Sequence, residues 1–171
     1  MDLKMKTITM ITLAAMMPTL SLADESWTGF NAGLQLSTID VSEGNKDNGN
    51  ATLGLHAGYL HDFDGYVIGG ELSYDAGAEV EAGGEAEKVD TLRLKFKGGH
   101  VFGRTYLYGV VGYAKIDGGS KSEDGYSAGV GVTYRATDKI LIGLEYLRDT
   151  YDTSGDDITA DSVALRLSYK F

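Results

Sequence analysis

The chain has 171 residues, a formal net charge of -10 and no cysteine, and its length suits one domain. The acidity argues against nucleic-acid binding, which needs a basic face, and the lack of cysteine excludes a disulfide framework and thiolate chemistry. With 24 Gly, 11 Tyr and a single Pro, the composition favours a β protein whose strands keep their backbone donors.

The first 23 residues have the pattern of a secretory signal peptide. Lys4 and Lys6 precede an apolar run over 8–17. Small residues, Ser21 and Ala23, then stand at the two positions that a signal peptidase reads. The apolar run is shorter than the roughly 20 residues that a spanning helix needs, which makes a membrane anchor the weaker interpretation. We therefore expect this segment to be cleaved and residues 24–171 to form the mature domain.

Eight segments of the remaining chain alternate apolar and polar residues with a period of two, which predicts strands. They are 28–37, 51–59, 66–74, 91–97, 105–115, 126–134, 140–146 and 162–171. The last of them, 162–171, has the length of a barrel strand that crosses a membrane in about 9 to 11 residues. The segment 105–115 is the least clear, because both of its faces are apolar. We assign Tyr106 to the outside and Lys115 to the inside, an assignment that could be reversed.

Long and short connections between these strands alternate strictly. The long ones are Asp40–Asn50, Asp75–Lys88, Ile116–Gly125 and Arg148–Asp161, and together they carry a formal charge of -12. Short periplasmic turns and long extracellular loops are typical of up-and-down outer-membrane barrels. The sequence therefore predicts an all-β protein, an eight-stranded antiparallel up-and-down transmembrane β-barrel.

A soluble barrel would also alternate, with its apolar face inward. Two features favour the inverse arrangement. The polar faces are rich in Gly, Ser, Thr and Ala, which suits the narrow interior of an eight-stranded barrel. The apolar faces carry tyrosines near the strand ends, as interfacial girdles do. We assign to the short-turn end Tyr59, Tyr66, Tyr106, Tyr134 and Tyr169, and to the loop end Tyr74, Tyr126 and Tyr146.

Over residues 24–171 the chain resembles the small eight-stranded outer-membrane barrels typified by OmpX and the transmembrane domain of OmpA. The resemblance rests on the signal segment, the alternating loop lengths, the strand Y-V-I-G-G-E-L-S-Y and the terminal Y-K-F. It implies a monomer in the bacterial outer membrane, surrounded by lipid and lipopolysaccharide. It also implies delivery by periplasmic chaperones to the barrel-assembly machinery, with Tyr169 and Phe171 as the C-terminal assembly signal.

Charged residues on the predicted inner faces point to a structural ion-pair network. The inward set is Glu71, Arg93, Lys95, Lys97, Lys115, Arg135, Glu145, Arg166 and Lys170. We expect Glu71 to pair with Arg93 and Glu145 with Arg166, because each pair flanks a long loop at similar distance on adjacent strands, and we place Lys95 in the same network. An unpaired buried charge costs several kcal/mol, so pairing is favoured over a charged open pore. Bases outnumber the two glutamates, and some bases must therefore reach water at the barrel ends.

The sequence offers no clear catalytic or metal site. None of His56, His61 and His100 stands beside a serine with an acid to orient it, as a lipid-modifying barrel would require. The acidic segment 148–161 could coordinate Ca²⁺, but it lacks the spacing of an EF-hand loop. We expect neither a cofactor nor a bound metal.

These observations predict a non-enzymatic integral outer-membrane barrel. Its acidic loops would serve membrane integrity, or surface interaction and adhesion with a host or environmental ligand. The alternative is a small passive, porin-like channel for ions or small solutes.

Overall fold

The computed structural model describes residues 26–41, 50–82, 85–118, 121–153 and 156–171. The predicted signal peptide lies outside the described residues, as does a part of each predicted long loop. Within the described part of the chain, no helix is long and apolar enough to cross a membrane.

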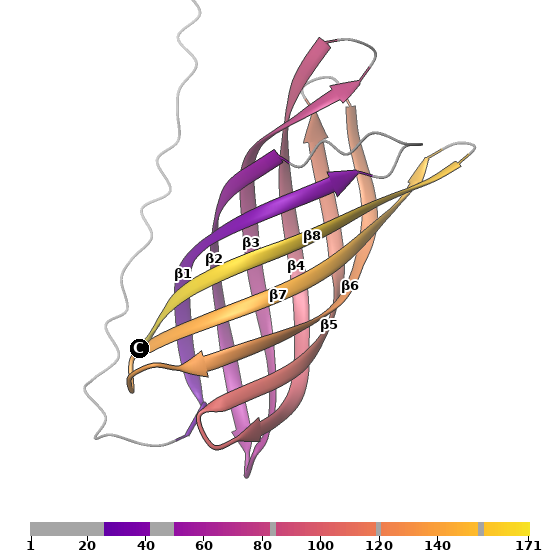
Figure 1. Cartoon of the computed structure of the whole chain (residues 1–171). Helices are drawn as coiled ribbons and strands as arrows, with labels where there is room; N and C mark the ends of the chain where they lie inside the picture. The colour runs from indigo at the N-terminus through magenta and orange to yellow at the C-terminus, as the bar shows by residue number, and fades with distance from the viewer. Residues whose placement is uncertain (1–25, 42–49, 83–84, 119–120, 154–155) are drawn as a thin grey trace, which may run out of the picture.

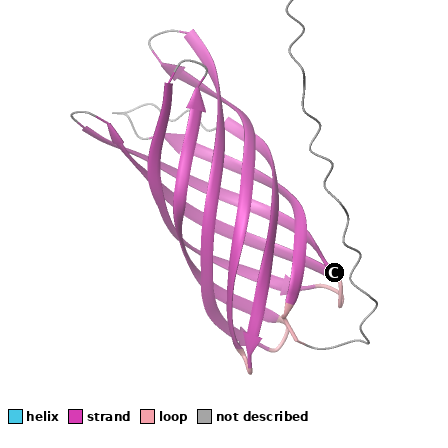
Figure 2. Cartoon of the chain, turned by 180° about the vertical axis from the view of Figure 1, so that it is seen from behind, coloured by secondary structure: helices cyan, strands magenta, loops and turns pink. Residues whose placement is uncertain are grey.

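Eight antiparallel strands form one closed barrel in chain order (Figures 1 and 2). They are β1 Gly29–Val41, β2 Asn50–Phe63, β3 Tyr66–Ala82, β4 Glu85–Phe102, β5 Thr105–Gly118, β6 Lys121–Arg135, β7 Ile140–Thr153 and β8 Asp156–Lys170. Each strand pairs with its sequence neighbours, and β1 closes the barrel against β8. The predicted fold, an all-β eight-stranded up-and-down barrel, is confirmed.

The strands are strongly tilted, as their register shows. A row of paired residues that starts at Lys170 on β8 passes through Asn31 on β1 and Glu71 on β3. It continues through Lys95 on β4 and returns to β8 at Ala160, ten residues from where it began. A stagger of this size tilts eight strands by roughly 40° from the barrel axis. Rows of paired residues therefore climb toward the long-hairpin end from β1 to β8.

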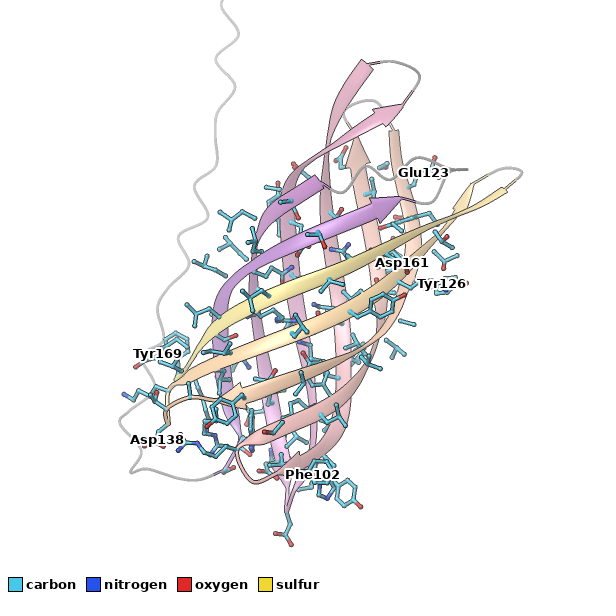
Figure 3. All side chains as sticks on the ribbon, in the orientation of Figure 1. Phe102, Glu123, Tyr126, Asp138, Asp161 and Tyr169 are labelled. Carbon is cyan, nitrogen blue, oxygen red and sulfur yellow. The ribbon has the colours of Figure 1, made fainter. Side chains whose placement is uncertain are left out.

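The barrel is apolar outside and polar inside, the reverse of a soluble protein. Outward side chains such as Leu53, Val130 and Leu165 are more than half exposed, at 62%, 58% and 56%. Inward positions of the same strands carry buried polar side chains, among them Thr52 and Arg166. Figure 3 shows the outer surface covered with side chains along the whole wall. Such a surface is stable against lipid and not against water.

The assignment of faces in β5 was wrong. Tyr106 and Tyr108 are buried in the interior, whereas Leu107 and Lys115 point outward and are exposed. The reason is the tight turn before β5, which pairs Phe102 with Thr105. Directly paired residues share a face of the sheet, and the outward face of β4 therefore continues onto Thr105 and every second residue after it.

The strands extend far into the predicted long loops. β3 and β4 stay paired out to Ala82 and Glu85, and β7 and β8 out to Thr153 and Asp156. β5 and β6 likewise stay paired out to Gly118 and Lys121. What the polar composition suggested as loops is therefore largely hairpin, and Figure 1 shows the β3–β4 and β7–β8 hairpins rising separately from the barrel wall.

Candidate functional site: the lumen and the long hairpins

Ion pairs cross the middle of the barrel from one wall to the other. Glu71 on β3 lies 2.8 Å from Lys95 and 2.7 Å from Lys97, both on β4. On the opposite wall, Glu145 on β7 lies 2.6 Å from Arg166 on β8. The two halves are joined, because Arg166 also contacts Glu71 at 2.6 Å and Lys95 also contacts Glu145 at 2.6 Å. Strands far apart in the chain are therefore tied together across the lumen.

A second buried cluster lies nearer the long hairpins. Arg93 on β4 contacts Asp75 at 2.6 Å and Asp149 at 2.5 Å. Asp75 also accepts a hydrogen bond from Gln35 at 2.7 Å, and Asp149 accepts one from Ser127 at 2.5 Å. All five side chains are buried. The carboxylates of this cluster are thus held by donors from three different strands, β1, β4 and β6.

The structure brings Glu145 and Arg166 together and places Lys95 in the same network. The predicted pairing of Glu71 with Arg93 is wrong, because Arg93 contacts Asp75 and Asp149 instead. Both aspartates lie on the inner face by simple parity, since Asp75 follows Glu71, and Asp149 follows Glu145, by four residues along a strand. Assigning them to loops hid this signal.

The two aspartates also reduce the expected excess of buried bases to Arg135, whose guanidinium lies over the ring of Trp27. Four acids face four bases in the two clusters taken together: Glu71, Glu145, Asp75 and Asp149 against Lys95, Lys97, Arg93 and Arg166. Lys115, expected in the lumen, points outward. A balanced set of buried charges avoids the cost of a stranded one.

The lumen is nearly filled by these side chains. Beside the network, a cavity of about 20 Å³ is lined by Asn31, Lys97, Tyr108 and Arg166 among others. Such a volume holds about one water molecule. Together with the ion pairs that cross the lumen, a cavity of this size leaves room for little more than one water molecule beside the network.

One histidine lies beside a serine, but without the third group of a catalytic triad. Nε2 of His56 is 2.7 Å from Oγ of Ser168 in the lumen. Nδ1 of His56 is buried and has no hydrogen-bond partner among the described residues, so no acid orients the ring. The described residues also contain no group of three or more His, Cys, Asp or Glu side chains that could hold a metal ion.

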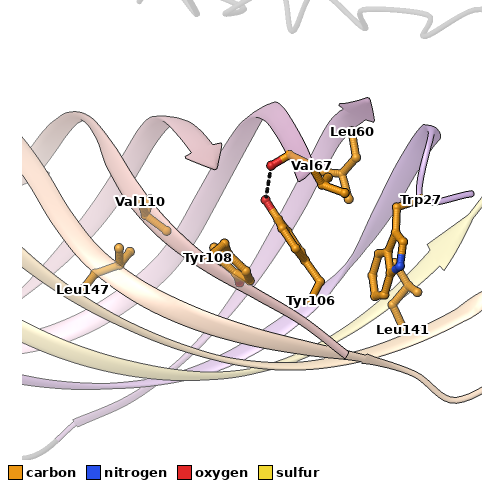
Figure 4. Close-up of a cluster of buried hydrophobic side chains, with 8 residues drawn as sticks. All are labelled: Trp27, Leu60, Val67, Tyr106, Tyr108, Val110, Leu141 and Leu147. Atoms are coloured by element: carbon orange, nitrogen blue, oxygen red, sulfur yellow. Dashed lines mark hydrogen bonds between the residues drawn. The ribbon is translucent and has the colours of Figure 1, made fainter. Parts of the chain in front are cut away.

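Apolar and aromatic side chains close the short-turn end of the lumen (Figure 4). Trp27, just before β1, is buried, and its ring lies 5.5 Å from that of Tyr106 and 4.5 Å from the guanidinium carbon of Arg135. Its backbone N–H donates to Asp62, near the end of β2, at 3.1 Å. The backbone at Gly29 has a φ of +146°, which lets the segment double back into the lumen where other residues would be strained. Trp27 therefore acts as a plug.

The predicted assembly signal lies on the lipid side of β8. Tyr169 and Phe171 are both exposed, and their ring centroids are 5.0 Å apart. The backbone N–H of Phe171 donates to the carbonyl oxygen of Phe30 at 2.9 Å, which anchors the chain end to β1. Recognition of this pair by an assembly machinery stays a prediction.

A closed antiparallel barrel with an apolar outer wall and a charged, filled interior defines a small transmembrane β-barrel. The family described as outer membrane protein beta-barrel domain matches residues 9–171. The chain belongs to this family and lies in the bacterial outer membrane. The predicted family resemblance and location are thereby confirmed. By the rule for such barrels, the short turns face the periplasm and the long hairpins the outside.

Solved structures of other small outer-membrane barrels share the fold. Neisserial surface protein A is 13% identical with a TM-score of 0.59, covering 84% of this chain and 98% of its own. Outer membrane protein H of P. aeruginosa is 17% identical with a TM-score of 0.53, covering 84% and 99%. Ail, the attachment invasion locus protein of Yersinia pestis, is 16% identical with a TM-score of 0.51, covering 84% and 97%. No curated protein matches the chain.

Proposed function

We propose that this barrel is a non-enzymatic surface-interaction protein whose extracellular hairpins bind a basic or cation-bridged partner. The observation that carries the proposal is the shape of those hairpins, which project from a filled barrel as paired strands with open edges. Rigid scaffolds that present polar connections at one end commonly place binding there.

The open edges follow from the register. β3 pairs with β2 only as far as Ala76, and β4 pairs with β5 only as far as Asp90. The hairpin residues 78–89 therefore pair only with each other among the described residues. Edge strands present unpaired backbone N–H and C=O groups, and these groups can pair with an extended segment of a partner.

The charge of the hairpins sets the chemistry of that partner. With Asp75 and Asp149 assigned to the lumen, the charge of the four extracellular segments falls from -12 to -10. The segment 78–89 alone contains four glutamates and one lysine. A partner with basic groups is attracted, and its binding should weaken as salt screens the charges.

The Yersinia pestis relative gives a useful contrast. Ail has been solved in complex with the heparin analogue sucrose octasulfate, a polyanion. A polyanion would be repelled by the acidic hairpins of this chain. We therefore expect the two proteins to differ in ligand while they share a barrel.

The alternative, a small channel, has weaker support. Ion pairs cross the lumen at 2.6 to 2.9 Å, and Trp27 plugs its periplasmic end. Catalysis also lacks support, since the His56–Ser168 pair has no orienting acid among the described residues. These features favour a structural lumen below a binding surface.

Adhesion to charged surfaces tests the proposal. Cells that display the protein should attach to a polylysine-coated surface more than cells without it, and should gain nothing on a heparin-coated one. A variant with Glu79, Glu81, Glu85 and Glu87 all changed to Gln keeps the hairpin length and removes four charges. It should lose most of the added attachment at low salt.

The matched control shortens the hairpins without touching the barrel. Replacing 78–89 and 152–159 by Gly-Ser turns should leave assembly intact, because closing a short loop costs little. Undiminished attachment by this shortened variant, folded and displayed in normal amount, would show that the hairpins do not bind the partner.

A further inference from the structure

Two hairpins carry the same three-residue arrangement on the outer surface of the barrel, at its extracellular rim. On β7, Tyr146 and Arg148 point outward, two residues apart. Asp161 on β8 accepts a hydrogen bond from the Tyr146 hydroxyl at 2.7 Å and two from Arg148, at 2.8 and 3.0 Å. The aspartate thus fixes the guanidinium, and the arginine side chain remains 57% exposed.

The second copy lies on β5 and β6. Tyr113 and Lys115 point outward, again two residues apart. Asp124 on β6 is paired in register with Lys115 and accepts a hydrogen bond from the Tyr113 hydroxyl. The order of tyrosine, base and facing aspartate is the same in both hairpins, and neither copy takes part in the lumen network.

The stagger of the barrel brings the two bases to similar heights. Arg148 lies in the same row as Ala128 and Val111, and Lys115 stands four residues farther toward the outside on β5. Because rows climb from β5 to β7, the two offsets partly cancel. With strands about 4.8 Å apart, about 3.4 Å per residue and a tilt of roughly 40°, the two Cα atoms stand roughly 16 Å apart around the wall and differ by about 4 Å in height.

This height is that of the lipid headgroups. Tyr113 stands two residues before Lys115 on β5, on the membrane side. It pairs with Tyr126 on β6, which is also exposed on the outer face. Figure 3 shows Tyr126 and Asp161 at the hairpin end of the barrel, far from Tyr169 and Phe102. Outward tyrosines mark the boundary between the hydrocarbon and the headgroups. Bases just beyond that boundary meet the polar heads of the outer leaflet.

We propose that Lys115 and Arg148 form a two-part site for the phosphates of a phosphorylated glycolipid in the outer leaflet. An ammonium and a guanidinium give charge-assisted hydrogen bonds to phosphate oxygens. Asp161 fixes the Arg148 guanidinium on the outer surface, and Asp124 stands in register with Lys115 as the matching acid of the second copy. The site goes beyond the proposed function, since its ligand is the surrounding lipid and not a partner above the membrane.

A third hairpin provides an internal comparison. Tyr74 on β3 donates to Asp90 on β4 at 2.8 Å, as in the other two copies. The position two residues after Tyr74 is Ala76, which is exposed and has no charge. The tyrosine and the aspartate are therefore present without the base. Introducing the base with Ala76→Lys should create an additional phosphate contact.

Native mass spectrometry of the folded barrel in detergent, titrated with bisphosphorylated lipid A, tests the site. We expect the Lys115→Gln/Arg148→Gln double variant to bind this lipid about tenfold more weakly than the parent chain, the size expected when charge-assisted hydrogen bonds at an exposed site are lost. Dephosphorylated lipid A should bind the parent no better than it binds the double variant. Ala76→Lys should bind the bisphosphorylated lipid more tightly than the parent.

Lys139 supplies the matched control. It is exposed at the periplasmic end, with its ammonium 5.8 Å from the ring centroid of Tyr169. Lys139→Gln removes one positive charge at this end, away from the proposed site. This variant should bind lipid A like the parent. Equal weakening by Lys139→Gln, unchanged binding by the folded double variant, or equally tight binding of the dephosphorylated lipid would each overturn the site.

Discussion

Replacing Glu145 by Gln should strongly destabilise the barrel while keeping its shape. The Glu145 side chain is 1% exposed and contacts Lys95 at 2.6 Å, Lys97 at 2.9 Å and Arg166 at 2.6 Å. Its other partner is the hydroxyl of Tyr108, which donates to it at 2.9 Å. After the change, three buried cations would share the single carboxylate of Glu71. Breaking a buried ion pair in this way costs about 3 to 5 kcal/mol.

Urea unfolding of the barrel in lipid vesicles measures this cost. With an m-value of about 2 kcal/mol/M, a loss of about 4 kcal/mol lowers the unfolding midpoint by about 2 M. The double variant Glu145→Gln/Lys97→Met removes one base together with the acid. It should recover much of the midpoint, because the network then regains its balance of charge.

The matched control removes an acid from a pair at the barrel surface. Asp161→Asn breaks the contact with Arg148, in which both side chains are partly exposed, and such pairs contribute little to stability. Its midpoint should stay close to that of the parent. A Glu145→Gln midpoint equal to that of Asp161→Asn would refute the reasoning that the lumen network holds the walls together.

Three further predictions concern the faces of the wall and the plug. Leu53→Arg, on the lipid face, should cost about 2 to 4 kcal/mol in vesicle unfolding, whereas Thr52→Ser in the lumen should cost little. Leu107→Arg should be as costly as Leu53→Arg, and a stable Leu107→Arg barrel would contradict the outward face of β5. The fluorescence of Trp27, the single tryptophan of the chain, should escape quenching by brominated lipid, because its ring lies in the lumen; strong quenching would place it on the lipid side.

The period-two pattern predicted the number of strands and most of their faces because a lipid-exposed wall keeps the alternation strict. It failed on β5, where both faces are apolar. Tyr106 and Tyr108 suit the lumen because each hydroxyl finds an acceptor there, on Val67 and Glu145. The two-residue turn at Gly103 and Arg104 could have corrected the error, since the outward face of β4 continues across it.

The ends of the strands were harder to predict than their faces. Polar, glycine-rich segments such as 75–88 have the composition of loops. They nevertheless form a hairpin, because β3 and β4 stay paired with each other beyond the barrel wall. This error hid Asp75 and Asp149, the acids that balance Arg93 in the lumen. The exact partners of a buried network depend on register and on distances across the barrel, and neither can be read from one strand alone.

Current through the folded parent barrel in a planar bilayer tests most directly the claim that the lumen is structural and that function lies outside it. The crossing ion pairs, the cavity of about 20 Å³ and the buried Trp27 plug predict no steady conductance steps at neutral pH. Steady single-channel steps from the parent barrel, absent from protein-free bilayers, would contradict the account and give precedence to the channel.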